Sequence, residues 1–471
     1  MPPSRLSVRA AQEKLGALLS RFVPTERQRL LALTIFSGAL CGLVAVSFHL
    51  AIAKSEAFFI NRAVSAPGFS WIYWTILTPA LGGLAVGLGL TYWVPGAVGS
   101  GVPQVKVAYA LHAGYIPLRE AFGKFVLCII QLGTGASSGR EGPTVQICAG
   151  ISSWLARAAS LSRQSQRRMA AVGVAAGIAA AFNAPIAAVT FTLEEVIGDL
   201  DQTMLSGVIV AAAIAAVVEH TILGQHPVFA VQHVYTLAAA SSLIWYAVLG
   251  VLSSFVAVAF TDTLLTLRAG FKRFSAVPKW THPMIGGLMT GTLAVLALTW
   301  LRQNGITGAG YATLSLALAG SLPVKVLLGL CLLKFAATAF SYGSGSVGGI
   351  FAPSLFIGGM LGGAVGYVDV IVFHHPTESI GAFALVGMGS VFAGIIRAPM
   401  TSILIIFEMT GSYGLVLPLM IANMTAYALT RRRRYMPIYE ALLKQDGILL
   451  PHGRPVTPED ELHEFPSEAL P

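Results

Sequence analysis

Apolar residues fill most of the chain between Leu31 and Thr430, interrupted only by short polar or basic stretches. A helix needs about 20 predominantly apolar residues to cross a bilayer, and several segments are long enough to do so. The segments that predict complete crossings include 31–52, 72–93, 204–222, 242–265 and 284–301. The pattern therefore predicts a membrane domain over 31–434, with a more polar segment on each side of it.

Other apolar segments are shorter and are bounded by glycine and proline. They cover 125–134, 144–155, 186–193 and 354–364. This pattern is typical of helices that end inside the membrane, which are tolerated only where protein or a water-filled cavity surrounds their polar ends. The fold class that we expect is an all-α polytopic membrane protein built from tilted and broken transmembrane helices.

The two halves of the apolar region carry matching breaks. Pro185 is followed nine residues later by Glu194, and Pro399 is followed nine residues later by Glu408. Matched halves with Gly/Pro interruptions indicate an inverted-repeat transporter whose site lies near the midplane, where the repeats meet. We interpret Glu194 and Glu408 as structural residues. The predicted repeats cover about 31–222 and 240–430.

Composition adds to this prediction, because 55% of the residues are hydrophobic and only 11% are charged, against about 25% charged residues in soluble domains. The net charge of +9 comes from basic clusters between apolar spans, which the positive-inside rule explains better than binding to nucleic acid. We therefore expect both termini to be cytoplasmic. The N-terminal 1–30 would be an amphipathic segment and 435–471 a short tail.

Metal and redox chemistry find little support in the sequence. An intramembrane metalloprotease needs two histidines around a glutamate at helical spacing, and none accompany Glu194 and Glu195. The cysteines lie singly in apolar segments, without the spacing of metal ligands, and predict neither a metal site nor a disulfide. They are Cys41, Cys128, Cys148 and Cys331. We expect no cofactor and no enzymatic activity.

Three glycine-rich stretches that end in proline, 99–103, 139–143 and 348–353, predict helix starts inside the membrane. The first N–H groups of a helix lack partners and carry about half a positive charge, so such ends bind anions in a dry cavity. Glu141 lies in the second start, and an ionisable group at that depth costs roughly 2.5–3.5 kcal/mol, which points to a function. The residues that frame these starts are Gly99, Gly101, Gly139, Arg140, Gly142 and Gly349.

These motifs resemble the CLC family of chloride channels and chloride/proton exchangers. The resemblance covers about 31–434 and rests on Gly99-Ser100-Gly101-Val102-Pro103, Gly139-Arg140-Glu141-Gly142-Pro143, Gly349-Ile350-Phe351-Ala352-Pro353, and Tyr413 after Glu408-Met409-Thr410. It implies a homodimer in the lipid bilayer with one anion pathway in each subunit. It also implies that the hydroxyls of Ser100 and Tyr413 bind the central chloride. The N–H groups of Ile350 and Phe351 would complete the chloride shell, and Glu141 would be the gating carboxylate.

The expected mode of transport depends on Glu195. This residue resembles the intracellular proton-transfer glutamate that exchangers of the family keep and channels replace, so it favours exchange of chloride for protons. A passive chloride-selective channel remains the alternative, because it would use the same anion ligands. Ser100 is similar to the serine of chloride-preferring members. The resemblance implies a bacterial protein of the inner (plasma) membrane.

Each proposed site residue also has a plainer interpretation. Glu141 would cap its helix, and Ser100 would be an N-cap hydroxyl. Tyr413 would be an interfacial aromatic residue, and Glu195 a solvated acid at a helix end. The segment 439–443 resembles the lead into nucleotide-binding CBS domains, but only about thirty residues follow it. We therefore expect no nucleotide partner.

Overall fold

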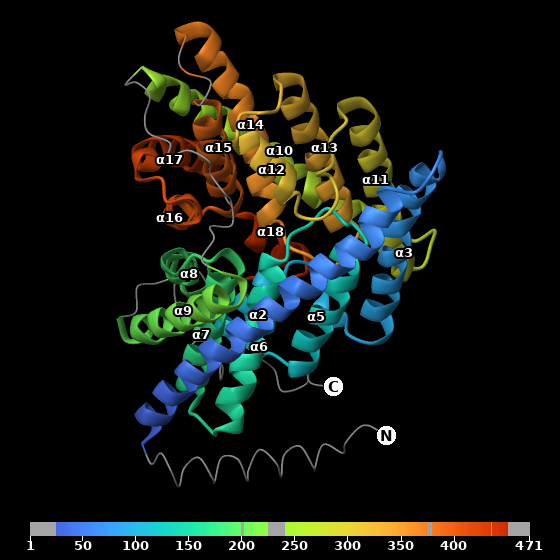
Figure 1. The fold of residues 1–471 in the computed structure, drawn as a ribbon. Helices are drawn as coiled ribbons and strands as arrows, with labels where there is room; N and C mark the ends of the chain where they lie inside the picture. The colour runs from blue at the N-terminus through green and yellow to red at the C-terminus, as the bar shows by residue number, and fades with distance from the viewer. Residues whose placement is uncertain are drawn as a thin grey trace.

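Helices make up most of the part of the chain that the computed structural model describes (Figure 1). That part covers residues 25–198, 202–224, 241–374, 376, 379–434 and 436–450. Within it, nine helices are long and apolar enough to cross a membrane. Large apolar side chains such as Phe36, Leu81 and Leu332 are exposed on their outer surfaces, which suits contact with lipid. The chain is a multi-pass integral membrane protein.

The first half of the chain forms a helical unit that ends at Leu223. Its helices alternate in length, and a 3₁₀ turn precedes α4. In order, the elements are α2 (Glu26–Val64), α3 (Ser70–Tyr92), η1 (Pro95–Ala97), α4 (Val102–Leu111), α5 (Leu118–Gly133), α6 (Glu141–Ala158), α7 (Arg163–Phe182), α8 (Pro185–Phe191), η2 (Thr192–Ile197) and α9 (Gln202–Leu223).

The second half repeats this alternation of long and short helices. In order, its elements are α10 (Ser242–Arg273), η3 (Lys279–Thr281), α11 (His282–Leu296), η4 (Ala297–Leu301), α12 (Tyr311–Leu318), α13 (Val324–Gly343), α14 (Phe351–Phe373), α15 (Ser379–Ile396), α16 (Pro399–Thr410), η5 (Tyr413–Leu415), α17 (Val416–Arg433) and α18 (Ile438–Gln445). Four of the five predicted crossings match long helices, with 72–93 ending one residue past α3, and the fifth runs through α11 into η4.

Two of the predicted short segments differ in the length of the helix that contains them. The segment 186–193 lies in α8, which has 7 residues, and its continuation η2. The segment 354–364, in contrast, belongs to α14, which runs for 23 residues. Its glycines do not break the helix, because they let α15 approach closely: a Cβ at Gly358 or Gly362 would overlap the α15 backbone. Glycine therefore marks close packing here rather than a helix end.

Glu194 in the first half and Glu408 in the second half each bind the start of a short helix in the opposite half. The Glu408 carboxylate accepts hydrogen bonds of 3.0 and 2.7 Å from the first-turn N–H groups of α8. The Glu194 carboxylate accepts hydrogen bonds of 3.1 and 2.8 Å from the first-turn N–H groups of α16. Each carboxylate accepts hydrogen bonds from N–H groups that have no partner within their own helix, and its negative charge interacts favourably with the positive end of that helix. The predicted structural interpretation of both residues agrees with these contacts.

Two fully buried lysines, one in each half, hold the loops that lead to short helices. Lys124 Nζ in α5 donates to Gly99 O over 2.8 Å, just before α4. Lys334 Nζ in α13 donates to Gly305 O and Gly308 O over 3.0 and 2.7 Å, just before α12. Carbonyl oxygens compensate for the burial of each charge, so the lysines fix the backbone of both loops.

The ends of the chain differ from the predicted boundaries. In the expected N-terminal segment, 1–30, residues 1–24 lie outside the described part of the chain, and residues 26–30 already belong to α2. The expected tail, 435–471, contains α18, which lies near the centre of the molecule (Figure 1) and contacts α4, α10 and α15. Apolar residues such as Ile438 and Leu442 are buried in that contact, which is why α18 packs inside rather than extending as a tail.

Candidate functional site

The three predicted helix starts meet and are joined through their backbones. Gly99 pairs with the segment before α14: Gly99 N donates to Ser346 O over 2.9 Å, and Gly348 N donates to Gly99 O over 3.2 Å. Gly139 and Gly349 exchange hydrogen bonds of 2.8 and 2.7 Å. These bridges bring together the N-termini of α4, α6 and α14, which are far apart in the sequence. Their positive ends therefore act on one region of the protein.

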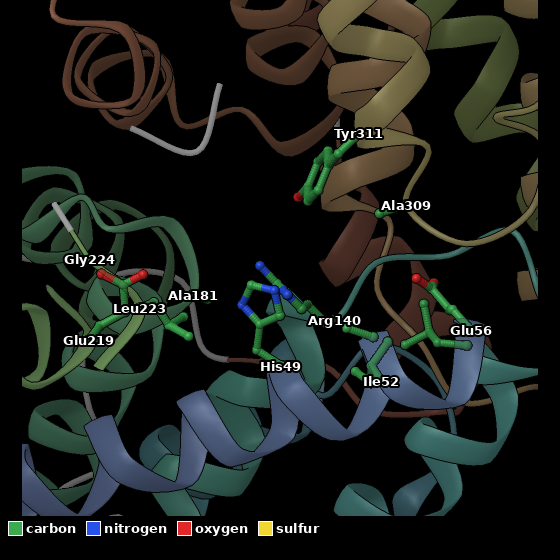
Figure 2. A pocket seen from close by; sticks show the side chains of 12 residues that line it. His49, Ile52, Glu56, Arg140, Ala181, Glu219, Leu223, Gly224, Ala309 and Tyr311 are labelled. Atoms are coloured by element: carbon green, nitrogen blue, oxygen red, sulfur yellow. The ribbon is translucent and has the colours of Figure 1, made fainter. Parts of the chain in front are cut away.

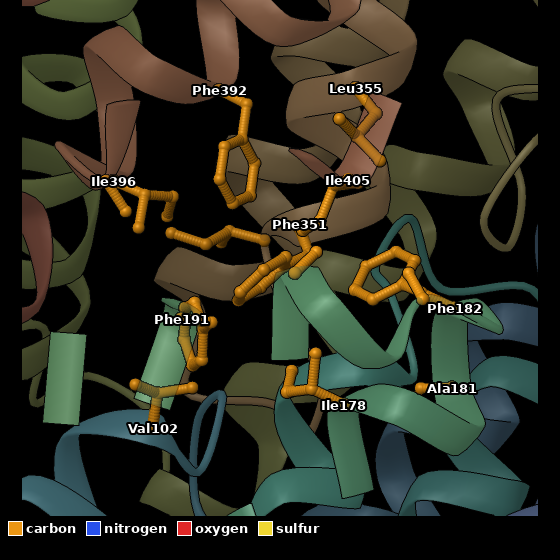
Figure 3. Packing of buried hydrophobic residues seen from close by; sticks show 14 of the residues in the cluster. Val102, Ile178, Ala181, Phe182, Phe191, Phe351, Leu355, Phe392, Ile396 and Ile405 are labelled. Carbon is orange, nitrogen blue, oxygen red and sulfur yellow. The ribbon is translucent and has the colours of Figure 1, made fainter. Parts of the chain in front are cut away.

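Ile350 and Phe351 begin α14, where the first N–H groups have no partner within the helix. Both residues are fully buried. The Phe351 ring lies between Phe182, Phe191 and Phe392 (Figure 3), with centroid distances of 5.8, 5.2 and 4.9 Å. The ring is thus a packing element, and its backbone is left to face the meeting point of the helix starts.

Ser100 lies at the start of α4 and is fully buried. Its Oγ accepts a hydrogen bond of 3.3 Å from Val102 N, but the N-cap of α4 is Gly101, so Ser100 does not have the N-cap position that the plainer interpretation gave it. Its O–H remains a donor for another group. Gly101 has φ +99°, a backbone conformation that favours glycine. Gly142 lies against Ser100, because a Cβ there would stand 2.7 Å from Ser100 O. Small residues therefore allow α4 and α6 to start side by side.

Tyr413, the predicted second hydroxyl of the anion site, does not lie with this group. It opens η5 on the outside of the molecule with 78% of its surface exposed. Tyr439 in α18 is fully buried instead, and its hydroxyl lies beside Ser100 without a hydrogen bond of good geometry to any described residue. The sequence held a signal for it, since Tyr439 lies among Ile438, Ala441 and Leu442 in a short apolar helix after the arginine run.

Glu141, the first residue of α6, is fully buried. Tyr311 Oη donates a hydrogen bond of 2.6 Å to Glu141 Oε1. Glu141 Oε2 lies against Gly139, where a Cβ would overlap it, so glycine at this position leaves room for the carboxylate. The carboxylate is therefore held between the helix starts and Tyr311 rather than in solvent. Tyr311 had not been singled out by any motif of the sequence.

Arg140 lies just before Glu141 and its side chain faces a different space. It lines a cavity of about 310 Å³ together with His49, Glu219 and Tyr311. Figure 2 shows His49 and Arg140 side by side, with Glu219 and Tyr311 on other walls. The Arg140 Nε atom is buried without a hydrogen-bond partner among the described residues. The cavity thus combines two basic side chains with acidic ones close to the buried Glu141.

Glu195 lies in η2 and is buried, which does not fit a solvated acid at a helix end. Its Oε1 accepts a 2.7 Å hydrogen bond from Lys106 Nζ, in α4. Lys106 also lies 3.6 Å from the Glu440 carboxylate, in α18. The buried lysine therefore links η2 to α4, which begins just after Ser100, and to α18, which carries Tyr439.

The described residues contain no group of three or more His, Cys, Asp and Glu side chains arranged to hold a metal ion. The four cysteines are buried and free. Cys41 Sγ lies 3.6 Å from Cys148 O and packs between α2 and α6. The chemistry available at the site is therefore that of helix N-termini, hydroxyls, carboxylates and buried lysines.

Asp446, just after α18, ties that helix to α10, and its replacement by asparagine tests the tie. Arg268 donates to both carboxylate oxygens over 2.9 Å. Burial opposes ionisation, but contacts with Arg268 and Lys272 outweigh it and hold the pKa of Asp446 below its ordinary value. A lowered pKa means that the tie is complete above about pH 4 and is lost as the pH falls further.

For the chloride site that the resemblance implies, we expect Asp446→Asn to weaken binding by about threefold, since a partly exposed ion pair contributes little and would act through the position of Tyr439 beside Ser100. Calorimetric titration of chloride into the purified protein measures this. Asp262→Asn is the control, because it removes the carboxylate of a different exposed ion pair, the 3.2 Å contact with Arg434. Equal chloride affinity in Asp446→Asn and the unmodified protein would contradict the prediction.

The helical membrane fold and the buried meeting point of helix starts define a membrane protein that is built to hold a small anion. A sequence profile of the family described as "Voltage gated chloride channel" matches residues 82–431. The chain therefore belongs to this family, and the resemblance to CLC proteins is confirmed.

Two kinds of relative support this assignment. The protein of Salmonella arizonae called "H(+)/Cl(-) exchange transporter ClcA" is 30% identical over 446 residues, which cover 92% of this chain and 93% of that protein. The structure of a slow cyanobacterial Cl-/H+ antiporter has a TM-score of 0.80 and 26% identity, over 89% of this chain and 98% of that one. A CLC-type fluoride/proton antiporter has a TM-score of 0.72 and 26% identity, over 88% and 97%.

Proposed function

We propose that this protein is a secondary active transporter that exchanges chloride for protons across a membrane. The observation that carries the proposal is the placement of two buried carboxylates, Glu141 at the start of α6 and Glu195 in η2. A channel needs only anion ligands, whereas coupling needs groups that carry protons. The printed names of the Salmonella relative and of the cyanobacterial structure describe exchange of the same two ions.

In the proposed mechanism chloride binds where the three helix starts meet. The N–H groups of Ile350 and Phe351 and the hydroxyls of Ser100 and Tyr439 supply donors without a fixed positive charge. Donors of this kind hold a small anion loosely enough for it to leave again. Tyr439 thus supplies the second hydroxyl for chloride, the role that the resemblance to CLC proteins implied for Tyr413.

Protons move through the two carboxylates in turn. Glu141 carries the proton on the side of the Arg140 cavity, and Glu195 carries it on the side of Lys106. Ionised Glu141 competes with chloride for the positive helix ends, and protonation removes its charge and frees the pathway. This competition couples the two ions, because the carboxylate and chloride exclude each other.

The protein would act as a homodimer in the inner membrane of a bacterium, with cytoplasmic termini. An apolar outer face supports the dimer: it includes exposed residues on four neighbouring elements, α8, α9, α16 and α17. They are Ile186, Val217, Met400 and Leu417, next to exposed Tyr413. Each subunit would keep its own anion pathway, since all the site residues described above come from one chain.

The test is to record chloride and pH together on liposomes that hold the purified protein, with membrane potential clamped by an ionophore. We expect an imposed chloride gradient to drive protons uphill, because coupled exchange converts one gradient into the other. Chloride flux without proton movement would contradict exchange and favour a passive chloride channel. Liposomes without protein give the background rate of both ions.

A further inference from the structure

A hydrogen bond from outside the recognised motifs fixes the Glu141 carboxylate. Tyr311 Oη donates to Glu141 Oε1 over 2.6 Å, although the two residues are 170 positions apart. The other oxygen, Oε2, is buried and has no hydrogen-bond partner within the described part of the chain. The position of the carboxylate therefore depends on the phenol hydroxyl of Tyr311.

The position of Tyr311 is itself tightly determined. Tyr311 is the first residue of α12, directly after Gly310, whose φ of +79° sets the turn into the helix. The preceding loop is held by Lys334 Nζ through the carbonyls described above, and Gly308 N donates to Ala136 O over 3.1 Å. The second bond ties the loop to the segment that leads into α6. The phenol is thus fixed relative to Glu141 by the backbone.

Tyr311 also separates Glu141 from open space. It lines the cavity of about 310 Å³ shown in Figure 2 and a second one of about 270 Å³, and Glu56 lies on the walls of both. Glu141 lines neither cavity and is fully buried. The carboxylate must leave its contact with Tyr311 before it reaches either cavity.

We propose that Tyr311 is a positioning residue that latches the Glu141 carboxylate between the helix starts of α6 and α14, where it competes with chloride. This inference rests on the proposed function in treating Glu141 as the gate. The latch lowers the free energy of the state in which the carboxylate excludes the anion. Its strength therefore sets how readily chloride displaces the gate and how fast the transporter turns over.

The variant Tyr311→Phe removes the hydroxyl and keeps the ring. A hydrogen bond to a charged group contributes enough that its loss should let chloride bind about tenfold more tightly, as measured by calorimetric titration of the purified full-length protein. Chloride efflux from liposomes should become faster. In the Glu141→Ala background, the same substitution should change neither quantity, because no carboxylate remains to be latched.

Tyr367→Phe is the matched control, since it removes a phenol hydrogen bond of 3.0 Å to Leu322 O at about 24 Å along α14 from the helix start. Weaker or unchanged chloride binding in Tyr311→Phe would overturn the latch, and so would an equal change with and without Glu141. If the unmodified protein moved chloride without protons, the proposed exchange would fail. The calorimetric comparison would still decide the latch, because it follows chloride alone.

Discussion

Replacing Glu141 by alanine is expected to abolish proton movement and to leave chloride flux in place. The reason is that Glu141 is the buried carboxylate at the start of α6 and is the proposed competitor of chloride. Without it, the positive helix ends remain available to the anion, but no proton carrier occupies the pathway. Simultaneous chloride and pH recording on liposomes measures both, and proton movement should fall to the rate of liposomes without protein.

Glu219→Gln is the matched control for this prediction. Glu219 is another acid of the Arg140 cavity, and it is not part of the helix starts. We expect the Glu219→Gln protein to keep coupled proton movement. Uphill proton transport by Glu141→Ala would contradict the assignment of Glu141 as gate and proton carrier.

Replacing Glu195 by glutamine is expected to stop proton movement and to destabilise the protein. The substitution leaves Lys106 buried without its 2.7 Å partner, and Glu440 at 3.6 Å compensates only in part. Breaking a buried ion pair from one side costs about 3 kcal/mol, so the thermal unfolding midpoint should fall clearly. Chloride flux should persist, because Glu195 is no ligand of the anion.

The double variant Glu195→Gln/Lys106→Met separates the two effects. It removes both charges, so we expect most of the stability to return while proton movement stays absent. Glu194→Gln is the control, because Glu194 is the neighbouring acid and caps α16. The Glu194→Gln protein should be less stable but should keep proton coupling. Proton pumping by the double variant would show that Glu195 is not the inner proton carrier.

Local patterns were enough to predict which segments form helices and where three of them begin inside the protein. The length of the apolar segments predicted the long crossings. The glycines and prolines around Ser100, Glu141 and Phe351 predicted helix starts, because the unpaired N–H groups of a helix start favour particular residue types in its first turn. Glycine was misleading at 354–364, where the same residue type serves close packing of α14 on α15.

Two tyrosines show the limit of such patterns. Tyr413 follows a recognisable motif but is exposed, whereas Tyr439 lies in a segment predicted to be a tail and is buried beside Ser100. Each tyrosine has a polar residue directly beside it in the sequence, so local composition does not separate them. Burial of α18 against α4, α10 and α15 decides between them.

The sequence by itself determined the membrane class, the repeated breaks and the identity of the buried acids. Only the tertiary structure decided which side chains accompany those acids: Lys106 with Glu195, 89 positions apart, and Tyr311 with Glu141, 170 positions apart. The physical reason is that helix formation depends on neighbours in the chain. Compensation of a buried charge, in contrast, depends on whichever group the packing of distant helices brings within hydrogen-bond distance.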